Sequence, residues 1–149
     1  MDAITQPDNL YVMSTSLDNL HRASKNWISE LKFWADELNF FKELLGRYFS
    51  NLVSYDRFDQ TQAIYYKIFS FEENNLPQLI KKLMDHEKRL ANTAQFSSRL
   101  DEEACRIEHQ EISRDLMNFM REMKSLKKDV FAFTESVIND EKLHHLMPI

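Results

Sequence analysis

The stretch CRIEHQEISRDLMNFMREMKSLKKDVFAFTESV, residues 105–137, decides the fold. Along it, uncharged side chains recur at alternating intervals of four and three positions. They are Cys105, His109, Ile112, Leu116, Phe119, Met123, Leu126, Val130, Phe133 and Val137. A period of 3.5 residues keeps such a line on one face of a helix, where it packs along a neighbouring helix. The stretch therefore predicts a long helix over about residues 100–143.

Two upstream stretches carry lines with the same spacing, and we call each such line a seam. The first seam predicts a helix over about residues 16–53: Leu17, Leu20, Ser24, Trp27, Leu31, Trp34, Leu38, Phe41, Leu45, Tyr48 and Leu52. The second predicts a helix over about residues 56–94: Phe58, Thr61, Tyr65, Ile68, Glu72, Leu76, Leu79, Leu83, His86 and Leu90. Proline lacks an amide hydrogen and crowds the preceding turn, so we expect a kink or short break near Pro77.

Short polar breaks near residues 54–56 and 95–100 separate the three predicted helices. Long helices joined by short loops favour antiparallel neighbours. The sequence therefore predicts an all-α, antiparallel up-down-up bundle with coiled-coil-like seams. We expect one domain over residues 15–145, preceded by an extended N-terminal arm over residues 1–14.

Composition excludes several classes of function. The chain has one glycine, Gly46, whereas phosphate-cradling loops need several at fixed spacing. Nineteen basic and 24 acidic residues give a net charge of −5, which argues against broad nucleic-acid binding. The single Cys105 forms no internal disulfide, which favours a cytoplasmic location. Since no stretch approaches about 20 apolar residues and the first residues are not typical of a signal peptide, we expect no membrane insertion.

Folding the helices back about the two breaks brings His86 level with His109, with Ser24 and His21 nearby. We expect the two imidazoles to lie in one buried layer, within hydrogen-bonding or metal-bridging distance. Desolvation would lower the pKa of both below about 6.5, because burial disfavours the charged ring. A carboxylate of Glu87, Glu108 or Glu111 would reverse that direction by pairing with an imidazolium.

Histidines on facing core positions, with carboxylates around them, are also typical of a metal site in a helical bundle. The candidate ligands are His86, His109, His21 and Glu108, and the candidate ion is a transition metal such as zinc or iron. The competing interpretation is a pair of buried histidines that bond to Ser24, to each other or to water. Glu72 and Glu37 are interpreted as charged pairs at the edge of the bundle.

Two pairs of apolar residues lie off the seams, each pair seven residues apart. Phe33 and Phe40 lie on the first helix, and Phe131 and Ile138 on the third. Paired stripes of this kind indicate a partner surface, which we expect to be a second copy, another protein or the N-terminal arm. The nearby basic cluster Lys124, Lys127 and Lys128 is interpreted as a solvated face.

No nucleophile is supported by the sequence, because the seams fill the helices. Cys105 lies one turn from His109 but is interpreted as a small buried apolar group. We therefore expect a non-enzymatic helical interaction or scaffold protein without a cofactor, which binds a protein partner or itself as a homo-oligomer. The alternative is a metal-binding, redox-active bundle that uses His86 and His109.

Overall fold

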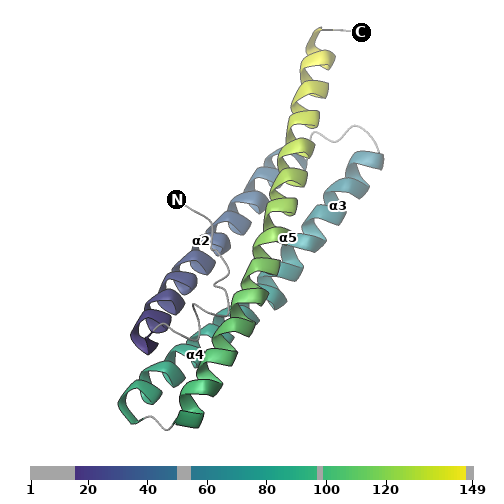
Figure 1. Ribbon diagram of the computed structural model, residues 1–149. Helices are drawn as coiled ribbons and strands as arrows, with labels where there is room; N and C mark the ends of the chain where they lie inside the picture. The colour runs from purple at the N-terminus through teal and green to yellow at the C-terminus, as the bar shows by residue number, and fades with distance from the viewer. Residues whose placement is uncertain (1–15, 50–54, 97–98, 147–149) are drawn as a thin grey trace.

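The computed structural model describes residues 16–49, 55–96 and 99–146. The first helix is α2 (Leu17–Phe49). The second consists of α3 (Tyr55–Ser70), the π-helical segment η1 (Phe71–Asn75) and α4 (Leu76–Phe96). The third is α5 (Arg99–Leu146). The three pack side by side in up-down-up order, with no strand in the described ranges (Figure 1).

The predicted all-α bundle is confirmed, and the predicted helix boundaries agree to within about four residues. Ser16 caps α2, since its Oγ accepts a hydrogen bond from the Asn19 amide at 3.2 Å. The helix runs unbroken through Gly46, which has no positive φ. The predicted N-terminal arm and residues 50–53 of the first predicted helix lie outside the described residues.

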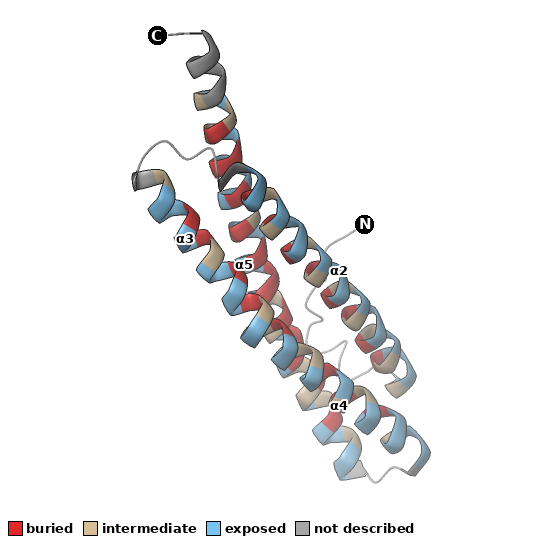
Figure 2. Cartoon of the chain, turned by 180° about the vertical axis from the view of Figure 1, so that it is seen from behind, coloured by how far each residue is buried: buried red, intermediate tan, exposed pale blue. Residues whose placement is uncertain are grey.

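The first and third seams form most of the core. All ten seam residues of α5 are buried, and so are all those of α2 from Leu20 to Leu45. Red lines of buried residues run along the facing sides of the helices in Figure 2. The side chains of Tyr48 and Leu52, at the end of the first seam, lie outside the described part.

Between Phe58 and Glu72 the second seam was predicted correctly at Thr61 and Ile68 but wrongly at its other three positions. In α3 and η1 the buried positions are Thr61, Ile64, Ile68 and Phe71. Tyr65 and Glu72 are only half-buried, and Phe58 is 39% exposed. From Leu76 onward the predicted seam holds, except that Leu79 is half-buried.

The π-helical segment η1 explains this shift. Buried Phe71 and buried Leu76 are five residues apart, where a regular seam allows three or four. The Leu76 amide donates to the Phe71 carbonyl, the hydrogen bond typical of a π-helix. Pro77 follows at once, so the wider turn lies where the proline ring would crowd the preceding turn. The predicted break near Pro77 is thus a wide turn, and the chain stays helical.

Ion pairs join the second helix to α5 along its length. Arg89 pairs with Glu108, Lys82 with Asp115, Lys67 with Asp129 and Arg57 with Asp140. Arg57 and Lys82 lie on either side of η1 and are 25 residues apart, and so are their partners Asp115 and Asp140 on α5. The pairs therefore stay in register on both sides of η1.

The two glutamates interpreted as edge pairs do form such pairs with lysines. Lys42 Nζ lies 3.0 Å from Glu72, which joins α2 to η1. Lys127 Nζ lies 3.7 Å from Glu37, which joins α5 to α2. Both pairs are partly exposed, so each contributes at most about 1 kcal/mol to stability.

Candidate functional site: a buried histidine pair

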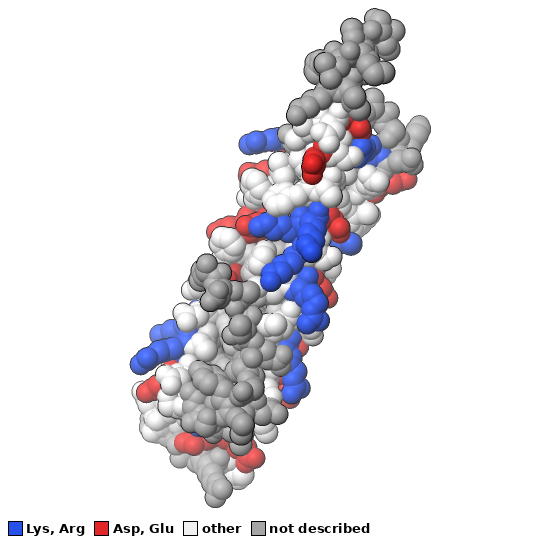
Figure 3. All heavy atoms as spheres, turned by 45° about the horizontal axis from the view of Figure 1, so that its top comes forward, with Lys and Arg blue, Asp and Glu red and all other residues white. Residues whose placement is uncertain are grey.

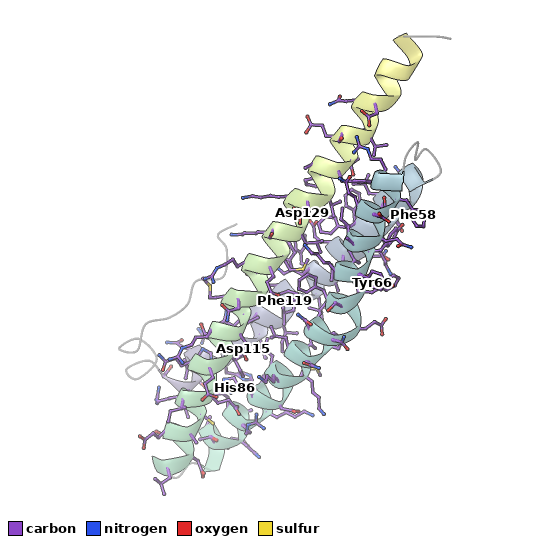
Figure 4. The ribbon with its side chains drawn as sticks, turned by 90° about the vertical axis from the view of Figure 1, so that its right-hand side faces the viewer. Phe58, Tyr66, His86, Asp115, Phe119 and Asp129 are labelled. Atoms are coloured by element: carbon purple, nitrogen blue, oxygen red, sulfur yellow. The ribbon has the colours of Figure 1, made fainter. Side chains whose placement is uncertain are left out.

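His86 of α4 and His109 of α5 meet in the core, toward the end of the bundle where α4 ends and α5 begins (Figure 4). Both side chains are 0% exposed. His86 Nε2 lies 2.9 Å from His109 Nδ1, so the rings are in direct hydrogen-bond contact. The predicted layer is confirmed, because both histidines occupy seam positions at the same level of neighbouring helices.

An acidic and a basic side chain extend this contact toward the surface. His86 Nδ1 lies 2.6 Å from Glu108 Oε1. Arg89 donates two hydrogen bonds to the same carboxylate, from Nε at 2.9 Å and from Nη2 at 2.7 Å. The four side chains form one chain of hydrogen bonds: Arg89, Glu108, His86 and His109.

This chain of bonds fixes where the protons lie. Burial alone would raise the pKa of Glu108, but the hydrogen bonds from Arg89 and His86 outweigh it and hold that pKa below its usual value. The ionised carboxylate only accepts, so His86 donates from Nδ1 and its Nε2 is free to accept. His109 then donates from Nδ1, and its Nε2 carries a lone pair.

Both histidines are held neutral by their surroundings. Burial lowers the pKa of His86, and the hydrogen bond to Glu108 opposes this change without reversing it. Burial, with the nearby His86, lowers the pKa of His109 to about 3. The predicted direction is confirmed for both rings. Glu108 does not reverse it, because burial outweighs the effect of Glu108 on the His86 pKa and the nearby Arg89 charge also lowers that pKa.

Two residues of α2 line the pair from the third side. The Trp27 indole stacks on the His109 ring, with centroids 4.5 Å apart and planes at 25°. Ser24 is fully buried, but its Oγ donates to the Leu20 carbonyl at 3.0 Å rather than to a histidine. Within the described residues His109 Nε2 is buried and has no hydrogen-bond partner.

The predicted metal ligands are only partly brought together. His86, His109 and Glu108 are in contact, whereas His21 faces Glu87, with 3.7 Å between Nε2 and Oε1. Two nitrogens bound to one tetrahedral zinc would lie about 3.3 Å apart, given Zn–N bonds of about 2.0–2.1 Å. His86 Nε2 and His109 Nδ1 are closer than this, at 2.9 Å, which is a hydrogen-bond distance. Across the described residues, no group of three or more His, Cys, Asp or Glu side chains is arranged to hold a metal ion.

Cys105 lies one turn before His109 and is almost fully buried. Its Sγ lies 3.4 Å from the Thr93 hydroxyl. A surface cavity of about 340 Å³ lies beside it, lined by residues that include Arg89, Thr93 and Glu108. The packing is that of a small core residue, as interpreted from the sequence.

The predicted interface residues lie at or near the surface. Phe33, Phe40 and Phe131 are 54%, 49% and 44% exposed, and Ile138 is half-buried. Phe131 also packs edge-on against the buried Phe41 of α2, with centroids 6.1 Å apart. The contact places Phe131 beside α2, so the two predicted stripes lie on the same side of the bundle.

Sequence reasoning missed Arg89 and Trp27 as parts of the histidine layer. Arg89 lies one turn after His86, and that spacing was a usable signal. It also missed the exposed aromatics Tyr66 and Phe69 of α3, of which Tyr66 projects from the outer side of the helix (Figure 4).

Comparison of the chain with protein-family models, with curated proteins and with solved structures gives no match. Among the helices that the structure describes, none combines the length and apolar character needed to cross a bilayer.

Proposed function

We propose that this chain is a non-enzymatic helical interaction protein that associates with itself through the side of the bundle formed by α2 and α5. The observation that carries the proposal is the exposure of three phenylalanine rings, Phe33, Phe40 and Phe131, on that side. Large apolar side chains gathered on one face typically mark a protein-binding surface. We call this face, made by these three rings and the exposed residues between them, the α2–α5 surface.

Helical spacing and contacts place the rings together. Phe33, Glu37 and Phe40 lie at intervals of four and three residues, so they share one face of α2. Glu37 pairs with Lys127 of α5, and the Lys127 ammonium lies over the Phe131 ring at 5.7 Å from its centroid. Phe33 and Phe40 therefore flank the contact with α5, and Phe131 lies on its other side.

Sedimentation tests the proposal. We expect the wild-type chain to sediment as more than a monomer at micromolar concentrations, and Phe33→Glu with Phe40→Glu to shift it to monomer with unchanged helical circular dichroism. The matched control is Tyr66→Glu with Phe69→Glu, since these rings are exposed on α3 instead. A wild type that is monomeric at high micromolar concentration, or a control with the same effect, would contradict the proposal.

The metal-binding alternative has support in the contact of His86, His109 and Glu108 and in the lone pair on His109 Nε2. Elemental analysis of protein purified without a nickel column is the test. Stoichiometric zinc or iron that is lost in His109→Phe would support this alternative. Metal-free protein with intact histidine contacts would exclude it.

A further inference from the structure

The two helices of the α2–α5 surface run in the same direction. Leu20 of α2 and Cys105 of α5 share one small core cluster, and farther along Phe41 contacts Phe131. The contacts Trp27–His109, Glu37–Lys127 and Phe41–Phe131 give the register. These contacts pair residues that are 82, 90 and 90 positions apart, about 87 on average. Asp36 and Lys124 are 88 positions apart, Glu43 and Lys128 are 85 apart, and Arg47 and Glu135 are 88 apart, so each pair lies within about two residues of the same level.

The two helices present opposite charges on this surface. On α2, Asp36 follows Phe33 by three residues and Glu43 follows Phe40 by three. On α5, Lys124 and Lys128 precede Phe131 by seven and three residues. All four charged side chains are exposed, and within the described residues none forms an ion pair. Figure 3 shows basic side chains gathered in a line along one face of the molecule.

At one end of the surface the charge of each helix changes sign, and the two changes occur at the same level. Arg47 ends the acidic line on α2, and Glu135 ends the basic line on α5 at the same level. Both are exposed. Each of these three levels therefore carries one acidic and one basic side chain, on opposite helices.

We infer that the α2–α5 surface is self-complementary and binds a second copy of this chain in parallel, about a two-fold axis that runs along the bundle. A two-fold axis parallel to the bundle leaves the height of each residue along the bundle unchanged. It places α2 of each copy opposite α5 of the other copy. Asp36 then meets Lys124, Glu43 meets Lys128 and Arg47 meets Glu135, twice over. The inference rests on the proposed self-association and names its geometry.

The other two-fold arrangement is disfavoured by the same charges. An axis across the bundle would set the copies antiparallel, with α2 facing α2 and α5 facing α5. Acidic side chains would then face acidic ones and basic side chains basic ones, which lowers affinity. The phenylalanines would be buried in either arrangement, so the charges decide between them.

Charge reversal on one helix at a time tests the arrangement. We expect Asp36→Lys with Glu43→Lys to weaken self-association on the order of 100-fold, because four attractive contacts become repulsive. Lys124→Glu with Lys128→Glu should have the same effect. The matched control, Lys81→Glu with Lys88→Glu, alters two exposed lysines of α4 and should leave association unchanged. An antiparallel pair would be insensitive to either reversal, because like charges would still face each other.

Mixing supplies the decisive readout. Neither reversed variant should pair with itself, but an equimolar mixture should form a heterodimer of wild-type stability, visible by native mass spectrometry. A chain that carries all four substitutions should recover self-association. Reversed variants that associate as tightly as the control would overturn the inference while self-association itself stands.

A monomeric wild type would overturn the inference together with the proposed function. If the N-terminal arm covers the surface instead, deletion of residues 1–14 should convert a monomer into a dimer, and charge reversal should not affect the full-length chain. A second copy is supported as the occupant if the full-length reversed variants form a dimer only when they are mixed with each other.

Discussion

Protonation of either imidazole in the His86–His109 pair introduces a charge at a position closed to water. Around the two rings lie Glu108 from α5, Arg89 from α4, and Trp27 and His21 from α2. Only Glu108 favours an imidazolium, and Arg89 already holds its carboxylate. Neutral rings are therefore the stable state of the folded chain.

Stability should consequently fall as the pH drops below about 6.5. The unfolded chain binds a proton on each histidine near that pH, whereas the folded chain resists protonation until the pH approaches about 3 for His109. Each histidine that stays neutral in the fold contributes a slope of up to about 1.4 kcal/mol per pH unit. The contribution is complete above the unfolded pKa and is lost as the pH falls toward the folded pKa.

Denaturant unfolding between pH 7 and pH 4 measures this slope. His109→Phe should flatten the curve, while His21→Gln, which alters a partly exposed imidazole outside the pair, should leave it unchanged. Equal slopes in the wild type and His109→Phe would contradict the assignment of the pH dependence to the pair.

Glu108→Ala should destabilise the fold by about 1–3 kcal/mol, because the buried His86 Nδ1–H loses its acceptor. The control is Asp115→Ala, seven residues along α5, which removes the partner of exposed Lys82 and should cost less than about 1 kcal/mol. Chemical denaturation of both variants at pH 7 gives the comparison. Similar losses would mean that His86 finds another acceptor.

At the scale of the helices, η1 reconciles the second helix with the straight seam of α5. A regular α-helix through residues 71–76 would turn either Phe71 or Leu76 away from the core. One turn with a wider hydrogen-bond ring keeps both buried. The cost is one turn of poorer geometry beside Pro77.

Removing one residue from this turn should therefore be tolerated. Deletion of Asn74 brings Phe71 and Leu76 to a spacing of four, so a regular helix satisfies both, and we expect stability within about 1 kcal/mol of wild type. Deletion of the exposed Asn118 from α5 is the control, because it rotates every later seam residue by about 100°. Thermal unfolding should show a large loss for that control alone. A large loss in both would mean that the wide turn has a packing role of its own.

At the scale of the whole molecule, the main hydrophobic cluster of the core packs between the three helices, and a separate small cluster holds Leu20, Leu90 and Cys105. Leu38, Leu83 and Leu116, one from each helix, are fully buried in the main cluster. Substitution of each by Ala should cost about 2–5 kcal/mol through lost contacts and a residual cavity. Leu100→Ala, at a position 77% exposed, should be nearly neutral. Equilibrium unfolding in urea measures all four, and near-neutral core variants would contradict the seam assignment.

Periodicity was sufficient to predict the helices, their order and the seams of α2 and α5, because the period reports which face a helix buries. It failed in part of α3 and η1, where Ile64 and Phe71 are buried in place of Tyr65 and Glu72. The cause is local: the extra residue before Pro77 changes the phase of the seam, and counting along the chain cannot tell on which side of the proline the change occurs.

The histidine layer shows the same division. Loop positions and seam spacing by themselves determined that His86 and His109 would meet, since short loops fix which levels of neighbouring helices face each other. Only the tertiary structure decided that Glu108 and Arg89 complete the hydrogen-bond chain, that His21 pairs with Glu87, and that Phe131 lies beside α2. These choices depend on rotamers and on the rotation of each helix about its axis. Packing of all three helices sets both at once, and no single stretch of sequence encodes them.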